Sequence, residues 1–405
     1  MRILIATNNF WLGGRETYVA TWLQQLGVKA DLLATQIDRD VPGLELFDAI
    51  EACGAEPYAQ RWQTWLARGA QMIARSRPDV IWAHHFELLP AWLLSRIHGI
   101  PLLTTFHGPV IGAGRPNDLM QTLGMTLAIH RGDAVTGVSE EILDNLRALN
   151  APGEPRLLPN TVAFADAPPP TRTPPRNFVL LTRRDKLEHI RQSALLFARY
   201  AKRVSGCRLV IADGEMKFKA NEAGSMRAAL RQLGGRWALG QGLGFLRTIP
   251  RVHFIGWTAD ARRHIREADV VLGMGRVVLE GIAEDRLAVL VGYKALHGVI
   301  TTANFDTFRR SNFSGRGVPE TSAAQVVEEL LGGKPDLSSK VDLISAQAWA
   351  PKLRAMLEDV ASRARRPDPL AAAIAAAGSA EEMFRVATRA LTDDELATLY
   401  RVSAG

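Results

Sequence analysis

Two glycines stand at the first place in the chain where chemistry is expected. Residues 10–16 (FWLGGRE) follow an apolar run, and Gly13 and Gly14 lie where a helix begins. Adjacent glycines let the backbone approach a ligand, and the free N–H groups of a helix N-terminus suit an anion. The same pair also makes a plain tight turn, so this stretch leaves both interpretations open.

Three histidines end the next two apolar runs. His84 and His85 close residues 78–85 (PDVIWAHH), and His107 lies in residues 105–108 (TFHG). Histidines at strand ends are either substrate contacts or satisfied structural residues. They also suggest zinc, but no carboxylate or cysteine with suitable spacing accompanies them, so we expect no metal.

Three cations follow an apolar run in the second half of the chain. Residues 180–186 (LLTRRDK) contain Arg183, Arg184 and Lys186. Arginine can hold phosphate oxygens with two hydrogen bonds, and lysine supplies a compact positive charge. The stretch is therefore a candidate phosphate site, with a solvated basic turn as the alternative.

The last candidate is a glycine-spaced turn with a single acid. Residues 272–283 (LGMGRVVLEGIA) place Gly273 and Gly275 before a helix and Glu280 inside it. A carboxylate there can accept hydrogen bonds from both hydroxyls of a ribose. Alternatively, Glu280 is an ordinary helix acid favoured by the helix dipole.

Short apolar runs alternate with segments of helical periodicity along most of the chain, which predicts doubly wound parallel sheets. The alternation stops at residues 166–176 (DAPPPTRTPPR), where five prolines predict a semi-rigid linker, and it then restarts. We expect a first domain over residues 1–165 and a second over residues 177–340. Helices over residues 341–405 come after it, at least partly packed on the first domain. Expected strands are residues 2–7, 29–35, 78–85, 100–108, 133–139, 177–183, 207–215, 251–257, 268–275 and 286–293.

Composition narrows the class of protein without fixing it. Hydrophobic residues make up 47% and charged residues 22% of 405 residues, as in a globular protein, and the net charge is +7. A basic excess fits anionic partners, but no dense Lys/Arg block with interleaved aromatics supports nucleic acid. Cys53 and Cys207 are expected to be buried free thiols. Without a signal peptide or a membrane-spanning run, we expect a cytoplasmic protein.

Two stretches raise the question of membrane contact. The helix predicted over residues 62–76 mixes Trp62 and Trp65 with arginines, as an interfacial helix does, although the two tryptophans also have core spacing. The basic insertion at residues 216–250 is either a solvated decoration or a flap toward an anionic substrate or membrane. Peripheral attachment at the inner membrane face is therefore an expectation held open.

Together, the motifs resemble a retaining glycosyltransferase of the GT-B fold, family 4. GGRE resembles its Gly-Gly-x-Glu loop, VTGVSEEI and TFHG its N-domain strand ends, RLLPN its Pro-Asn stretch, and ADVVLGMGRVVLEGIA its Glu-x7-Glu segment. VLLTRRDK, IADGE and VHFIGW resemble further motifs of its second domain, in the same order. The resemblance runs from residue 2 to about residue 360. It implies two Rossmann-like domains with a cleft between them.

The resemblance implies a role for each candidate residue. No metal or cofactor is implied; the donor would be a nucleotide-sugar, a UDP-sugar first, and the acceptor a small molecule, a glycan or a lipid-linked compound. His107 would lie beside the transferred sugar, while Arg183 and Lys186 neutralise the departing diphosphate, with Arg184 as the alternative partner of Lys186. The donor-binding set would be Gly13, Gly14, Arg184, Gly273, Met274, Gly275, Arg276 and Glu280, and the acceptor side His84, His85 and Glu16.

This sequence departs from the family in three places. Leu272 replaces the first acid of Glu-x7-Glu, the spacing between Arg183 and Lys186 is short, and Asp285 and Leu287 stand where the family has Gly and Pro. Since the phosphate and ribose motifs are kept, we expect an active transferase with altered recognition of the donor sugar. The alternatives are a non-catalytic nucleotide-binding partner subunit and a GT-B-fold UDP-sugar epimerase. An NAD-dependent oxidoreductase is disfavoured because no G-x-G-x-x-G follows the first strand.

Overall fold

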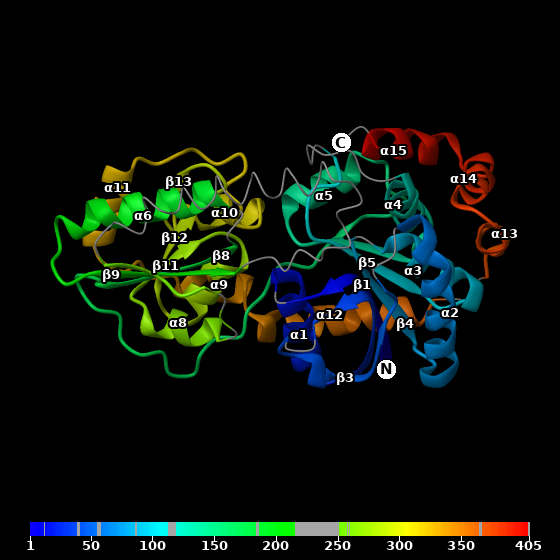
Figure 1. Ribbon diagram of the computed structural model, residues 1–405, viewed down its shortest axis with the longest axis horizontal. Helices are drawn as coiled ribbons and strands as arrows, with labels where there is room; N and C mark the ends of the chain where they lie inside the picture. Colours follow the sequence, from blue (N-terminus) through cyan, green and yellow to red (C-terminus); the bar gives the residue numbers. More distant parts are fainter. Residues whose placement is uncertain are drawn as a thin grey trace. The chain divides into compact units, whose positions relative to one another are not determined.

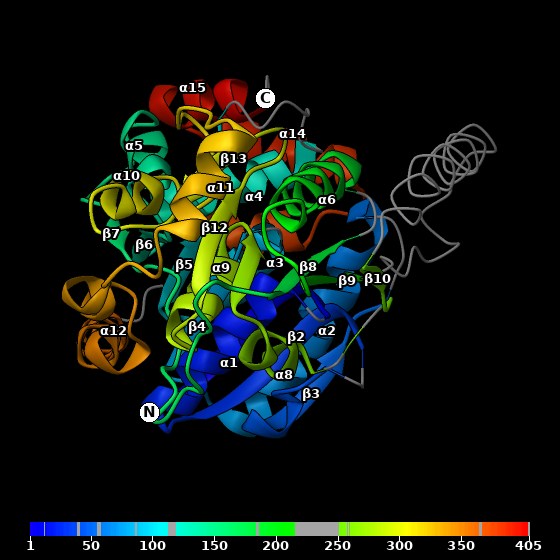
Figure 2. The same cartoon turned by 90° about the vertical axis from the view of Figure 1, so that its left-hand side faces the viewer.

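The chain forms two compact units in the computed structural model (Figures 1 and 2). The first unit comprises Met1–Asn160 and Ala346–Gly405, and the second comprises Thr161–Ser345. The structure describes residues 1–11, 13–38, 41–54, 58–85, 87–111, 119–183, 186–214, 251–256, 258, 260–363 and 367–403. Arg184 and the insertion at residues 216–250 lie outside the described residues.

A seven-stranded parallel sheet forms the centre of the first unit, in the order β3-β2-β1-β4-β5-β6-β7. Its middle strands are apolar on both faces because helices cover both sides of the sheet. The strands are β1 (Arg2–Phe10), β2 (Lys29–Ile37), β3 (Phe47–Ala52), β4 (Val80–His84), β5 (Leu102–Phe106), β6 (Ala134–Gly137) and β7 (Arg156–Leu157).

The helices of this unit come from both ends of the chain. Trp62 and Trp65 of α2 are buried in its core, so their core spacing was the correct interpretation and they offer no aromatic face to a membrane. The C-terminal helices α13 and α15 pack on α3 and α4 (Figure 1). The helices are α1 (Gly14–Leu26), η1 (Leu44–Leu46), α2 (Tyr58–Ser76), α3 (Leu88–His98), α4 (Leu119–Arg131), α5 (Glu140–Arg147), α12 (Ala346–Ala361), α13 (Pro369–Ala375), α14 (Ala380–Arg389) and α15 (Asp393–Ser403).

The second unit is built on a six-stranded sheet in the order β10-β9-β8-β11-β12-β13, parallel except for β13. Helices α6 and α11 lie side by side over one of its faces. The elements are β8 (Asn177–Arg183), α6 (Leu187–Ala201), β9 (Arg208–Gly214), β10 (Val252–Phe254), α8 (Ala261–Glu267), β11 (Val270–Gly273), α9 (Arg276–Ala283), β12 (Leu287–Val291), β13 (Leu296–Val299), α10 (Phe305–Arg310), α11 (Ala323–Leu331) and η3 (Ser338–Leu343).

Alternate residues of the central strands in this unit face opposite layers. Leu180 and Leu272 pack under α6, whereas their neighbours Val179 and Val271 pack with Ile265 of α8. This alternation is the period of two expected of a strand. Both units are thus doubly wound Rossmann-like domains, as predicted.

The proline-rich segment is part of the second unit and is anchored to it. The buried carboxylate of Asp269 accepts hydrogen bonds from the backbone N–H groups of Arg172, Arg176 and Asn177, at 3.1, 2.8 and 2.8 Å. The buried Arg286 side chain donates to the carbonyl of Pro169 in the same segment. These contacts fix the entry of the chain into β8.

Candidate functional site

Two of the predicted histidines meet at neighbouring strand ends of the first unit. His84 ends β4 and His107 follows β5, and parallel neighbours place both at one edge of the sheet. His84 Nδ1 lies 3.0 Å from His107 Nε2, which is a hydrogen bond. The Tyr18 ring of α1 packs edge-on against His107, with ring centroids 4.9 Å apart, and Trp82 packs against His84 at 5.0 Å. His84 is fully buried and His107 is half-buried.

The surroundings keep all three histidines neutral. Burial lowers the pKa of His84, His85 and His107, and the nearby charge of Arg15 lowers each further. The pKa of His85 falls to about 4. Its ring lies against Phe106, with ring centroids 5.7 Å apart. The three imidazoles are therefore hydrogen-bonding groups at neutral pH rather than cations.

The glycine turn before α1 holds one of the protein's own carboxylates. Gly13 caps the helix in an extended conformation, and Gly14 is its first residue. A Cβ on Gly13 would lie 2.6 Å from Glu16 Oε2, so the absence of a side chain lets the buried Glu16 fold back over the turn. Glu16 thus lies at the helix N-terminus, where the dipole favours an anion.

Arg15 in the same turn balances that carboxylate, and the sequence motifs gave no role to it. Its Nη2 donates to Glu16 Oε1 at 2.7 Å and to the carbonyl of Asn9 at 2.7 Å. Its charge also acts on the three histidines. In the sequence, the only signal for a role of Arg15 is its place between the glycine pair and Glu16.

In the second unit, the predicted lysine lies against the predicted turn. Lys186 precedes α6, and its Nζ is 3.8 Å from the sulfur of Met274 and 5.2 Å from the ring centroid of Tyr293. Tyr293 follows β12 and is 52% exposed. Arg183 ends β8 as an exposed residue. The structure therefore brings Lys186 together with the turn over residues 273–275, at the carboxyl edge of a parallel sheet, where open α/β sheets bind ligands.

The predicted ribose acid is paired within its own helix. Arg276 Nε donates to Glu280 Oε1 at 2.9 Å, and Arg276 Nη1 donates to the carbonyl of Thr161 at 2.8 Å. The Arg276 side chain is 9% exposed and the Glu280 side chain 29%. Arg276 thus orients Glu280, whose second oxygen, Oε2, can accept a hydrogen bond from a hydroxyl group.

Leu272, which stands where the family has the first acid of Glu-x7-Glu, lies in the core. It is a β11 residue in register with Leu180 of β8 and Val289 of β12, and its side chain is fully buried. An acid on this backbone would place an unpaired carboxylate among aliphatic side chains, which is costly. Leu272 therefore contributes to the packing of the core, in addition to lacking a polar group.

A loop outside the sequence motifs supports the turn. The N–H of Gly275, which has φ +59°, donates to the carbonyl of Phe313 at 2.7 Å. Asn312 and Phe313 both have left-handed backbone, which costs about 1–3 kcal/mol at each residue and persists only where the surroundings enforce it. Phe313 is buried against Phe305, with ring centroids 5.3 Å apart. The loop over residues 311–317 (SNFSGRG) is therefore a fixed wall beside the turn.

His297 fixes the other end of this loop. Its Nδ1 lies 3.0 Å from the carbonyl oxygen of Pro319 and donates a hydrogen bond to it, which fixes the orientation of the ring. Cβ atoms added to Gly292 or Gly315 would lie 2.5 and 2.4 Å from His297 Nε2. Both glycines are thus required for the close packing of the loop on the end of β12.

The described residues offer neither a metal centre nor a membrane span. No group of three or more His, Cys, Asp or Glu side chains in the described part of the chain is arranged to hold a metal ion. No helix among those residues is long and apolar enough to cross a bilayer.

Comparison with known proteins shows which folds this chain is similar to. Residues 13–161 match the glycosyl transferase 4-like domain, whereas no curated protein sequence matches the chain. Among solved structures, HepE of Anabaena in complex with UDP and glucose is 14% identical, with 89% of this chain and 100% of that chain covered and a TM-score of 0.57. A glycosyltransferase of Rickettsia africae is 12% identical over 90% and 99%, with a TM-score of 0.53. The UDP-GlcNAc 2-epimerase of Methanocaldococcus jannaschii is 10% identical over 89% and 100%, also at 0.53. At these identities the likeness shows the fold, and the chain has the GT-B fold as predicted.

Proposed function

We propose that the protein is a metal-independent, retaining glycosyltransferase that uses a UDP-sugar. One observation carries the proposal: Lys186 contacts the glycine turn that leads into the Glu280 helix, at the carboxyl edge of a parallel sheet. A cation and a carboxylate on either side of a half-buried glycine turn suit a nucleoside diphosphate, whose phosphates need positive charge and whose ribose needs an acceptor. The match of residues 13–161 to a glycosyltransferase domain and the UDP bound by HepE support it.

The reaction breaks the bond between the anomeric carbon and the diphosphate oxygen of the donor. A hydroxyl oxygen of the acceptor forms the new bond on the same face of the sugar, and its proton leaves with the diphosphate. Lys186 neutralises the charge that develops on the leaving group, and the fixed turn over residues 273–275 positions the donor. No cofactor takes part, and the acceptor is a small molecule, a glycan or a lipid-linked compound.

The binding part is tested by thermal unfolding with UDP, GDP, TDP and their sugar conjugates. A ligand that binds only the folded protein stabilises it by about 2.7 kcal/mol at a hundredfold excess over its Kd. We expect UDP to raise the melting temperature and one UDP-sugar to raise it further. Lys186→Ala should abolish most of this shift, whereas Lys202→Ala, an exposed lysine at the other end of α6, should retain it.

The catalytic part is tested by the release of UDP from that UDP-sugar, first with water and then with acceptor mixtures. We expect roughly a hundredfold slower release in Lys186→Ala, the loss typical of one fixed charge-stabilising group. Binding without turnover under any acceptor would indicate the non-catalytic partner subunit instead. Isomerised UDP-sugar formed without an acceptor would indicate the epimerase. Equal shifts in Lys186→Ala and the unchanged protein would refute the site itself.

A further inference from the structure

The direction of the hydrogen bond between His84 and His107 can be assigned from the surroundings of His84. At 3.0 Å between His84 Nδ1 and His107 Nε2, one nitrogen holds the proton and the other accepts. Burial lowers the pKa of both rings, so each is a neutral imidazole with a single N–H. Two arrangements therefore remain, and they differ in the tautomer of both residues.

The second nitrogen of His84 distinguishes the two arrangements. The His84 side chain is fully buried, and its Nε2 makes no hydrogen bond with the residues that the structure describes. If Nε2 held the proton, a buried N–H donor would be left unpaired, which is rare in folded proteins; an unpaired acceptor is tolerated better. The proton of His84 is thus on Nδ1 and is donated to His107.

The rings around the pair keep this arrangement in place. Tyr18 packs edge-on against both imidazoles, with ring centroids 6.2 Å from His84 and 4.9 Å from His107. Trp82 packs on His84, and its Nε1 is itself fixed by a 2.8 Å hydrogen bond to Thr105 Oγ1. Close aromatic packing on a fully buried ring leaves no room for a different ring orientation.

We propose that His84 is a positioning residue that holds His107 as the Nδ1–H tautomer, so that His107 serves as a hydrogen-bond donor to a substrate oxygen and not as a base. Its Nε2 lone pair is occupied by His84, and Nδ1 carries the only proton of the half-buried ring. Hydroxyl and phosphate oxygens of a sugar donor or acceptor are the matching partners. The assignment of this partner rests on the proposed function, whereas the tautomer does not.

The tautomer is read directly by long-range ¹H–¹⁵N correlation spectra of the full chain labelled only in histidine. The His107 and His84 signals are assigned from the spectra of His107→Gln and His84→Asn. We expect both residues as Nδ1–H tautomers at neutral pH, and the His107 signal to move when a UDP-sugar binds. A His107 signal of the Nε2–H form overturns the proposal. This spectrum needs no activity, so the tautomer can be established even if no nucleotide binds and the proposed function fails.

Two variants test the positioning role. The amide nitrogen of His84→Asn can replace the Nδ1–H donor, whereas His84→Leu offers no donor. We expect His84→Asn to retain the Nδ1–H form of His107 and most of the UDP-sugar turnover, and His84→Leu to lose roughly tenfold, the value of one oriented hydrogen bond. Equal turnover in His84→Leu and the unchanged protein would overturn the role. If His84→Leu does not fold, the spectrum of His84→Asn decides.

Discussion

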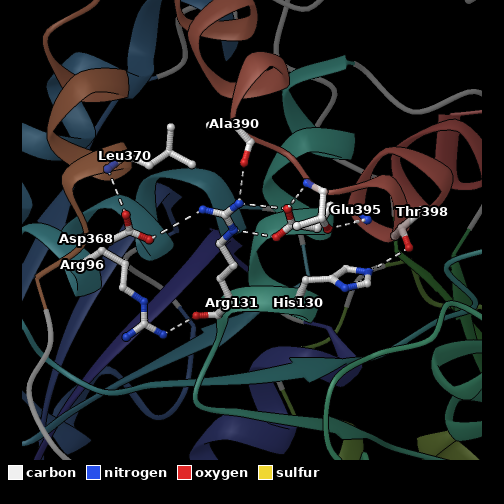
Figure 3. A network of polar contacts seen from close by, with 9 residues as sticks. Arg96, His130, Arg131, Asp368, Leu370, Ala390, Glu395 and Thr398 are labelled. Atoms are coloured by element: carbon white, nitrogen blue, oxygen red, sulfur yellow. Dashed lines mark hydrogen bonds and ion pairs between the residues drawn. The ribbon is translucent and has the colours of Figure 1, made fainter.

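Glu395 is expected to hold the C-terminal helices on the first unit through one carboxylate (Figure 3). Its oxygens accept hydrogen bonds from Arg131 at the end of α4, at 2.5 Å to Nε and 2.8 Å to Nη2. The same carboxylate accepts the N–H of Thr392 at 2.7 Å, while the Glu395 N–H donates to Thr392 Oγ1 at 3.3 Å. These two hydrogen bonds form a capping box at the start of α15. Arg131 also donates to the carbonyl of Ala390 and lies 3.8 Å from Asp368.

The perturbation is Glu395→Gln, which keeps the shape of the side chain and removes its charge. Breaking a buried ion pair from one side costs about 3–5 kcal/mol because the other charge stays desolvated. The Glu395 side chain is 5% exposed, but the Arg131 side chain is 23% exposed, so the lower end, about 3 kcal/mol, applies. For a unit of this size, a loss of 1 kcal/mol lowers the melting temperature by roughly 2–4 °C. We therefore expect a decrease of roughly 6–12 °C.

Differential scanning calorimetry measures the decrease, and hydrogen exchange locates it. Amides of α13, α14 and α15 should exchange faster in Glu395→Gln than in the unchanged protein, since these helices lose their attachment to α4. Glu382→Gln is the matched control: its carboxylate accepts the N–H of Gly378 at 2.9 Å on the exposed side of α14. A change below about 2 °C in Glu395→Gln, or an equal change in Glu382→Gln, would refute the assignment of the energy to the ion pair.

Single positions support three more predictions. The pKa of His85 is about 4, below its unfolded value of 6.5, so the unfolded chain binds the proton first as the pH falls. His85 should therefore contribute up to about 3 kcal/mol to the stability that the first unit loses between pH 6.5 and pH 4, and His85→Gln should reduce the loss in calorimetric scans by that amount. Leu272→Glu should lower the free energy of unfolding in urea by roughly 4 kcal/mol or more and Leu272→Met by less than about 1.5; a tolerated Glu that tightens UDP-sugar binding would contradict the core position. Gly315→Ala should reduce the rise in melting temperature caused by a UDP-sugar more than Gly317→Ala does. Both glycines have positive φ, but only a Cβ at residue 315 would collide with His297. Equal effects of the two substitutions would show that the loop is not part of the donor site.

The sequence predicted the inner strands of both sheets because those strands are continuous apolar runs. It missed β3, whose residues alternate between buried and exposed at a sheet edge and include Asp48 and Glu51. It also missed β13, a strand of four residues that contains Gly298 at φ +104° and pairs antiparallel. Edge strands lack the two-sided burial that makes inner strands conspicuous in a sequence.

The candidate site was predictable at strand ends and unpredictable in its contacts. Topology alone places His84 and His107 at one edge, because β4 and β5 are parallel neighbours. By contrast, Lys186 and Met274 are 88 residues apart, and nothing local in either stretch reports that their side chains meet. The strained loop beyond residue 310 was equally hidden, since left-handed Asn312 and Phe313 result from packing rather than from propensity.

The position of Leu272 decides how the missing acid should be understood. A leucine that replaced a ligand-facing acid would leave a hole in a binding site, whereas Leu272 fills the space between β8, β12 and α6. The turn that follows Leu272 is nevertheless fixed, because the Gly275 N–H donates a hydrogen bond to the Phe313 carbonyl and Lys186 contacts the Met274 side chain. A turn that is fixed from two sides in this way is the arrangement expected of a site whose contacts to a ligand come from the backbone. Under the proposed function, we therefore expect the donor sugar to be recognised by the turn over residues 273–275 and the loop that supports it, rather than by a single carboxylate.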